Sequence, residues 1–88
     1  MKNSGKAFEG ASARPIRYII SYYGYECFQE QTGTKAQAFQ ALRTAVKETL
    51  AEARRRNKNW QKKKNSDTSY SIEMGINLYT TIGLHIFE

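Results

Sequence analysis

Residues 34–53 read TKAQAFQALRTAVKETLAEA, and this stretch decides the fold because it carries a sustained helical pattern. Its larger apolar side chains recur at steps of three and four residues and form one stripe: Phe39, Leu42, Val46 and Leu50. Alanines, the best helix formers, fill positions around them and widen that stripe. Thr34 and Gln37 fit a capping box, in which each side chain bonds to the other residue's backbone amide. The sequence therefore predicts one long amphipathic helix that begins after Thr34 and ends between residues 56 and 63.

Two strands are expected before the helix. Residues 16–22 alternate with a period of two, which places the side chains of Ile16, Tyr18, Ile20 and Tyr22 on one face. Gly24 then allows a tight turn, because glycine reaches positive φ without strain, and residues 25–31 return as the second strand of a hairpin. The alternative is one long strand with a bulge at Gly24.

Two further strands are expected after the helix. Residues 70–76 and residues 82–86 alternate apolar with polar or small side chains, which is typical of half-buried strands. We expect a turn from Asn77 to Thr80 and a loop over residues 65–67. The sequence thus predicts an α+β fold: an antiparallel sheet of about four strands, in ββαββ order, with one long helix packed on one face and the other face open.

The length of the chain limits it to one domain, since 88 residues are close to the smallest common domain size. Residues 1–13 are small and polar without a period, so they are expected to form a flexible N-terminal tail to a single α+β domain over residues 14–88. Cys27 and His85 are the only cysteine and the only histidine, which predicts no internal disulfide, no metal site and no cofactor. No stretch has the apolar length of a signal peptide or membrane span, which favours a cytoplasmic protein without a membrane partner.

An enzyme is not expected, because these residues supply no catalytic triad and no metal-ligand set. Glu48 and Glu52 share a helix face but have basic neighbours. Glu52 precedes Arg55 by three residues and Arg56 by four, which predicts surface ion pairs. Residues 33–35 open a helix after a strand but lack the frame of a phosphate-binding loop.

The net charge of +6 arises in one stretch, residues 54–64. This stretch has seven basic residues and no acidic one: Arg54, Arg55, Arg56, Lys58, Lys62, Lys63 and Lys64. The rest of the chain has the other seven of the fourteen basic residues and all eight acidic ones, a net charge of −1. Arginine binds phosphate with two parallel bonds, lysine adds point charges, and the indole of Trp60 offers a face for a base. This basic helix end and the loop after it are therefore the candidate nucleic-acid site.

The same stretch also has a purely structural interpretation. Cations at a helix C-terminus complement the helix macrodipole, and a lysine run beside a loop is often only solvated. An acidic protein surface is a further partner for these residues. Trp60 continues the apolar stripe of the helix, so core-edge packing is the first expectation for it and a stacking platform is the alternative.

Tyrosines supply a second candidate surface. Tyr18 and Tyr22 share one face of the first strand, whereas Tyr23 falls on the other. Tyr22, Tyr23 and Tyr25 lie close together in sequence, and open aromatic sheet faces stack bases in several RNA-binding folds. The signature of the RNA recognition motif is absent, and ordinary cross-strand pairing of tyrosines is the alternative.

Two classes of function remain. The first is a non-enzymatic protein that binds the phosphate backbone of nucleic acid through the basic helix end and loop. The alternative is a phage or mobile-element inhibitor that binds a host protein complex, such as one that handles nucleic acid. Anti-CRISPR proteins belong to that class, and the analogy is one of class and not of residues. An uncovered sheet edge also predicts a homodimer through that edge.

Overall fold

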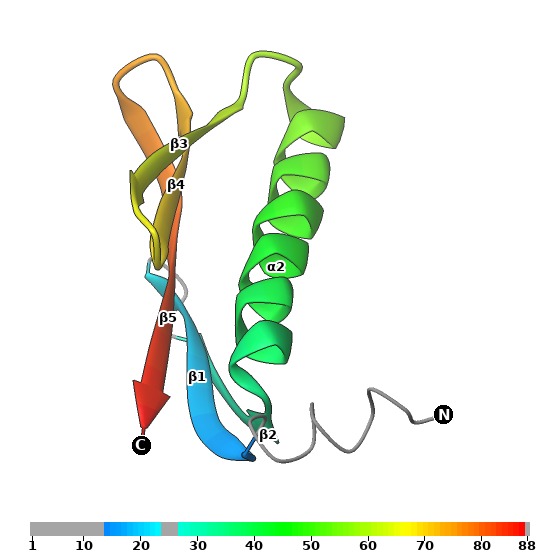
Figure 1. The fold of residues 1–88 in the computed structure, drawn as a ribbon. Helices are drawn as coiled ribbons and strands as arrows, with labels where there is room; N and C mark the ends of the chain where they lie inside the picture. The colour runs from blue at the N-terminus through cyan, green and yellow to red at the C-terminus, as the bar shows by residue number, and fades with distance from the viewer. Residues whose placement is uncertain (1–13, 24–26, 88) are drawn as a thin grey trace.

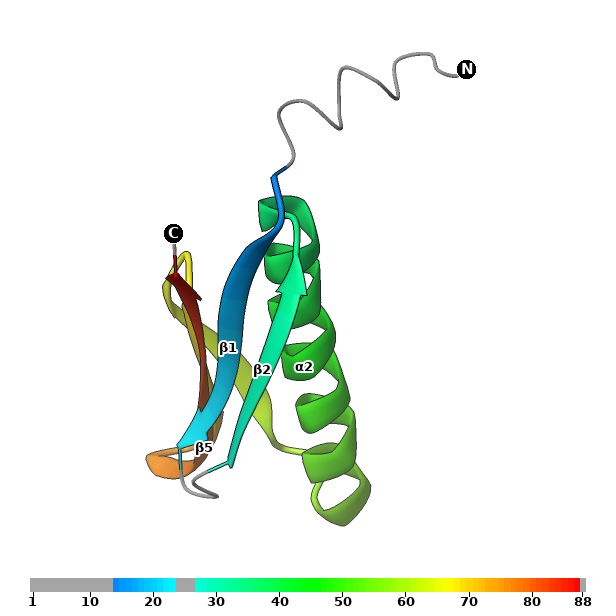
Figure 2. The same cartoon turned by 90° about the horizontal axis from the view of Figure 1, so that it is seen from below.

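The computed structural model describes residues 14–23 and 27–87, which form one antiparallel sheet with one helix against it (Figure 1). In chain order the elements are β1 (Ile16–Tyr23), β2 (Cys27–Gly33), α2 (Lys35–Arg56), β3 (Gln61–Ser66), β4 (Ser69–Met74) and β5 (Asn77–Phe87). The strands lie in the spatial order β2-β1-β5-β4-β3, and every neighbouring pair is antiparallel. Viewed from below, the helix is a second layer on one face of a twisted sheet (Figure 2). The α+β class and the single covering helix are therefore confirmed.

The helix begins and ends for local reasons. Its N-terminus has both bonds of the capping box: the Thr34 amide donates to Gln37 Oε1 at 2.8 Å, and the Gln37 amide donates to Thr34 Oγ1 at 3.1 Å. Its C-terminus follows three arginines, after which Asn57 adopts extended backbone with φ −155° and ψ 125°. The end at Arg56 lies at the near limit of the predicted range. No helix in the described part of the chain is long and apolar enough to cross a membrane.

The first two strands form the predicted hairpin, which excludes the single long strand. β1 and β2 pair without interruption from Ile16 opposite Gly33 to Tyr22 opposite Cys27. The second strand runs two residues later than the predicted residues 25–31. The predicted turn at Gly24, Tyr25 and the proposed N-terminal tail lie outside the described residues.

The prediction of about four strands is wrong by one, because the order is ββαβββ. The additional strand is β3, where the sequence analysis expects the helix end and a loop over residues 65–67. Both faces of β3 are polar and exposed, so its sequence lacks the apolar alternation that marks a strand. It forms because its backbone pairs antiparallel with β4, in register from Gln61 opposite Glu73 to Lys64 opposite Tyr70.

The turn between the last two strands is also misplaced by the sequence analysis. It lies at Gly75 and Ile76, not from Asn77 to Thr80, and β5 already begins at Asn77. Gly75 has φ 62°, which glycine adopts without a steric penalty. The β4–β5 pairing shifts between Ile72 and Glu73, so one extra residue of β5 interrupts the alternation there.

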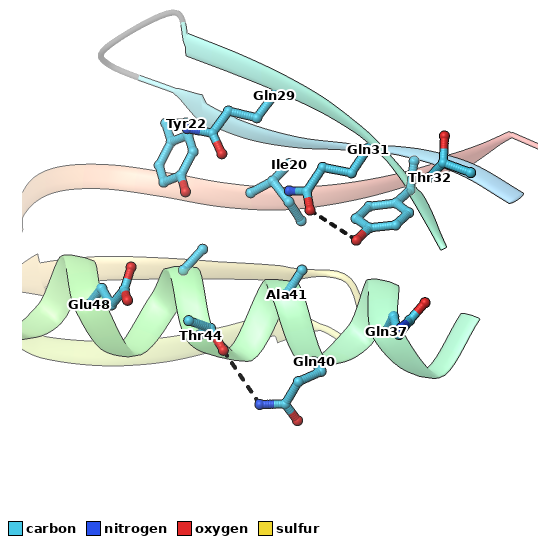
Figure 3. Close-up of a pocket in the computed structure, with 12 residues that line it drawn as sticks. Ile20, Tyr22, Gln29, Gln31, Thr32, Gln37, Gln40, Ala41, Thr44 and Glu48 are labelled. Atoms are coloured by element: carbon cyan, nitrogen blue, oxygen red, sulfur yellow. Dashed lines mark hydrogen bonds between the residues drawn. The ribbon is translucent and has the colours of Figure 1, made fainter. Parts of the chain in front are cut away.

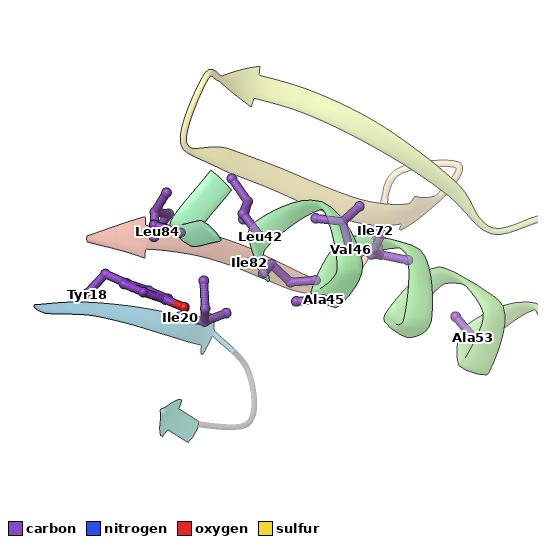
Figure 4. Packing of buried hydrophobic residues seen from close by; sticks show 10 residues of the cluster. Tyr18, Ile20, Leu42, Ala45, Val46, Ala53, Ile72, Ile82 and Leu84 are labelled. Carbon is purple, nitrogen blue, oxygen red and sulfur yellow. The ribbon is translucent and has the colours of Figure 1, made fainter. Parts of the chain in front are cut away.

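The core lies between α2 and the middle of the sheet (Figure 4). Leu42 and Val46 of the apolar stripe pack with Ile20, Ile72 and Ile82, and all five are at most 3% exposed. Three buried alanines, Ala38, Ala45 and Ala53, have side chains short enough to bring the helix backbone close to the sheet. α2 lies chiefly over β5, with β1 and β4 to either side.

Truncation of the core leucine tests this packing. Leu42 is 1% exposed, so Leu42→Ala removes buried apolar contacts and leaves a cavity, which should cost about 2–5 kcal/mol of unfolding free energy. Leu78→Ala makes the same chemical change at a side chain that is 59% exposed and should change stability by less than about 0.5 kcal/mol. Urea denaturation followed by circular dichroism measures both, and equal losses would contradict the assignment of the core.

Candidate anion-binding groove

The basic stretch is distributed over three elements of the structure. Residues 54–56 form the last turn of α2, Lys58 lies in the connection to β3, and residues 62–64 lie in β3. The prediction that the basic residues after the helix belong to a loop is therefore wrong for Lys62, Lys63 and Lys64. Their placement in a strand matters because successive strand side chains point to opposite faces of the sheet.

Two of the three arginines are held by one carboxylate. The carboxylate of Glu52 forms one ion pair with Arg55, three residues later, and one with Arg56, four residues later. In the second pair, Arg56 Nη2 lies 3.6 Å from Glu52 Oε2. This confirms the predicted pairing. Arg54 instead donates from Nε to the backbone carbonyl of Trp60 at 3.0 Å, which satisfies a donor but does not neutralise its charge. Arg54 is thus the arginine of this turn that the structure leaves without a carboxylate contact among the described residues.

The lysines of β3 divide between the two faces of the sheet. Lys62 lies opposite Ile72 and Lys64 opposite Tyr70, on the side of the sheet that α2 covers. Lys63 lies between them and therefore faces the other side. Lys64 Nζ contacts Asp67 Oδ1 at 3.1 Å, and this hydrogen-bonded carboxylate raises the pKa of Lys64.

A groove of about 610 Å³ lies between α2 and the β3–β4 side of the sheet. Its lining combines four apolar or aromatic residues with four cations: Val46, Leu50, Ala51, Tyr70, Arg43, Lys47, Arg54 and Lys62. No carboxylate is among these lining residues. We call this the basic groove. A lining with a charge of +4 and four apolar or aromatic side chains could accept an anionic group that also has an apolar part.

The helix supplies three of the four cations from one flank. Arg43, Lys47 and Arg54 are separated by four and seven residues, spacings that return to the same side of an α-helix. Arg43 and Lys47 are not among the residues predicted for this site, because they lie outside the apolar stripe and upstream of the basic run. Their helical spacing from Arg54 was the sequence signal that could have grouped them with it. The contribution of Lys62 could not be predicted, because it depends on β3 being a strand.

Trp60 packs against the core and does not line the basic groove. It is half-buried, and its ring lies 5.0 Å from that of Tyr79 between centroids, tilted by 57°. This geometry is typical of an aromatic pair. The structure therefore places Trp60 where the core-edge interpretation expects it, at the point where the chain leaves α2 for β3.

The tyrosines do not form one surface. Tyr22 is half-buried on the helix side of β1, whereas Tyr23 is 58% exposed on the other side, as their alternation predicts. Tyr18 is buried beside the helix, and its hydroxyl donates to Gln31 Oε1 at 3.1 Å. Tyr25 lies outside the described residues.

A second cleft, of about 520 Å³, lies on the opposite flank of α2, between the helix and the β1–β2 hairpin (Figure 3). Amides dominate its polar lining: Gln29 and Gln31 from β2, and Gln37 and Gln40 from the helix. Glu48 is its one ionisable carboxylate and no lysine or arginine lines it. We call this the amide cleft. The two flanks of the helix thus differ in charge.

Ser21 and the histidine meet on the face of the sheet away from the helix. Ser21 Oγ lies 3.3 Å from His85 Nε2, and Ser21 is fully buried. No group of three or more His, Cys, Asp or Glu side chains within residues 14–23 and 27–87 could hold a metal ion. No family model, curated protein or solved structure matches this chain.

Removal of the Asp67 carboxylate tests the Lys64 contact. Asp67→Asn should lower the pKa of Lys64 towards the ordinary value of a lysine side chain, because the hydrogen bond to the carboxylate is the main cause of the raised pKa. A group whose pKa is higher in the folded state than in the unfolded state stabilises the fold at pH values below its unfolded-state pKa. This stabilisation is lost as the pH rises through the folded-state pKa. An NMR titration of lysine side chains at alkaline pH measures the shift. An unchanged Lys64 titration in Asp67→Asn would contradict the contact.

Proposed function

We propose that the protein is a non-enzymatic cytoplasmic module that binds single-stranded nucleic acid in the basic groove. The observation that carries this proposal is a groove lined by four cations and four apolar or aromatic residues, without a carboxylate in the lining. Phosphates occupy the rim, where Arg43 and Arg54 offer bidentate contacts and Lys47 and Lys62 add point charges. The net charge of +6 attracts the polyanion to this side of the molecule.

The apolar floor favours a single strand over a duplex. A duplex exposes its phosphates but keeps its base faces stacked inside, so the floor of the groove would contact nothing suitable. A single strand can turn its bases onto apolar and aromatic side chains while its phosphates remain at the rim. Leu50 and Tyr70 are the half-buried floor residues that such bases would cover. The chemistry distinguishes neither RNA from DNA nor one base from another.

Two double variants with the same change in charge test the site. Arg43→Gln with Lys47→Gln removes two rim cations, whereas Arg55→Gln with Arg56→Gln removes two cations already paired with Glu52. Both pairs lie on the same helix. The first variant should weaken binding of a single-stranded oligonucleotide strongly and reduce the salt dependence of log affinity by about 0.7 per lost phosphate contact. The second should change both quantities less.

Fluorescence anisotropy over a series of salt concentrations measures both quantities, with an equal length of duplex as the comparison. Equal losses in the two double variants would show that only overall charge matters and would remove the basic groove as the site. Absence of any salt-dependent binding would remove the proposed function itself.

A second candidate function is supported by the tip of the β4–β5 hairpin. Ile76 is fully exposed and Leu78 is 59% exposed, next to the turn at Gly75. Two exposed apolar side chains on a protruding turn suit a pocket on a protein partner. On this alternative the protein is an inhibitor of the phage or mobile-element type, comparable in class to anti-CRISPR proteins, and binds a host complex that itself handles nucleic acid.

Capture from a nuclease-treated lysate separates the two functions. The inhibitor function predicts a stoichiometric protein partner that remains bound after nuclease treatment and is lost with Ile76→Ser but kept with Arg43→Gln and Lys47→Gln. The nucleic-acid function predicts that captured partners are released by nuclease, lost with Arg43→Gln and Lys47→Gln, and kept with Ile76→Ser.

A further inference from the structure

The two edges of the sheet differ in how they resist pairing with another strand. β3 is one edge, and it has three consecutive lysines and a register shift between Lys64 and Ser66. Lysines and irregular pairing are devices by which natural edge strands avoid intermolecular pairing. β2 is the other edge, and its seven residues, CFQEQTG, pair with β1 without a register shift. β2 has no lysine, arginine, proline or register shift, and its one charged side chain is Glu30.

Charge also separates the two edges. Pairing of two copies through β3 would bring six lysines together, because residues 62–64 of each copy would meet. At β2 the one charged side chain is Glu30, and its carboxylate accepts an ion pair from Arg17 of β1 at 3.2 Å. The excess positive charge lies on the far side of the helix, around the basic groove. A second copy that approaches β2 therefore meets no run of like charges: Glu30 is paired with Arg17, and Glu48 is the one carboxylate in the cleft beside β2.

We propose that β2 is a homodimer interface, at which β2 of a second copy pairs antiparallel to give one continuous ten-stranded sheet. An antiparallel pair of identical strands is related by a two-fold axis, so the same surface serves both copies. Gln29 and Gln31 suit such an interface because an amide side chain both donates and accepts and is thus complementary to itself. Phe28, which is 62% exposed, is the apolar side chain of this edge that the second copy would cover.

The amide cleft adds surface to this contact. Edge-to-edge pairing alone buries little area, and a stable interface needs more than about 1,000 Å² in total. The cleft runs beside β2 on the helix side, with Gln29 and Gln31 in one wall and Gln37 in the other. Side chains of the second copy's edge strand lie next to this opening and can enter it. The interface therefore comprises the β2 edge, Phe28 on one face and the amide cleft on the other.

The dimer places the two basic grooves at opposite ends of the extended sheet. Each groove lies towards β3, the edge farthest from the two-fold axis. This arrangement keeps the positive surfaces apart, and the proposal holds whether or not the grooves bind nucleic acid. If they do, one dimer can engage two segments of the same strand.

Light scattering on nuclease-treated protein tests the proposal. The wild-type chain should show twice its mass of 10.1 kDa at high concentration and dissociate on dilution. Phe28→Lys with Gln29→Lys gives β2 the protection that β3 already has and should yield a folded monomer, with at least a tenfold rise in the dimer dissociation constant. Asn59→Lys with Asn77→Lys adds the same charge at exposed positions away from β2 and should remain dimeric.

Hydrogen exchange of the wild-type protein covers the case in which the β2 variant does not fold. Backbone amides of residues 28–32 should exchange faster on dilution, while those of residues 61–66 should not change. A strictly monomeric wild-type chain, a dimer that survives Phe28→Lys with Gln29→Lys, or dilution-dependent exchange in β3 instead of β2 would each overturn the proposal.

Discussion

A single helix covers a sheet that is wider than the helix, and the main surface features follow from this constraint. An α-helix with its side chains is about 10–12 Å across. Five strands spaced by about 4.8 Å extend over about 19 Å between the outermost backbones. α2 lies over β5, the central strand, and contacts β1 and β4 to either side. The outer strands β2 and β3 therefore extend beyond it, and each flank of the helix has a cleft with an edge strand of the sheet at its outer wall.

The sequence of the helix gives these two flanks different chemistry. One flank presents Arg43, Lys47 and Arg54 towards β3, where Lys62 adds a fourth cation. The other presents amide and hydroxyl groups towards β2, which contributes more amides. Charge is thus segregated across the width of one helix. The flank without cations, where Glu48 is the one charged lining residue, would repel a second copy less than the basic flank, which attracts anions.

Local patterns were enough to predict the helix, its capping box and the first hairpin, since each depends on residues close in sequence. β3 could not be predicted, because QKKKNS becomes a strand only through backbone pairing with β4. The basic groove could not be predicted either. Its four cations come from two elements, and Lys62 reaches the helix side only because the strand alternates. The β4–β5 turn was misplaced because the extra residue in β5 breaks the period on which a sequence pattern depends.

Structural effects account for most of the basic residues in the stretch 54–64, but not for two cations of the basic groove. Residues 54–56 occupy the last turn of a helix, where the macrodipole favours cations. The lysines of β3 protect an edge strand, a role that requires no anionic ligand. Neither effect explains Arg43 and Lys47, which lie in the middle of α2, beyond the last turn in which the macrodipole acts. They line the basic groove together with two further cations, Arg54 and Lys62. Arg43 and Lys47 are therefore stronger evidence for an anionic ligand than the run of basic residues that follows them in the sequence.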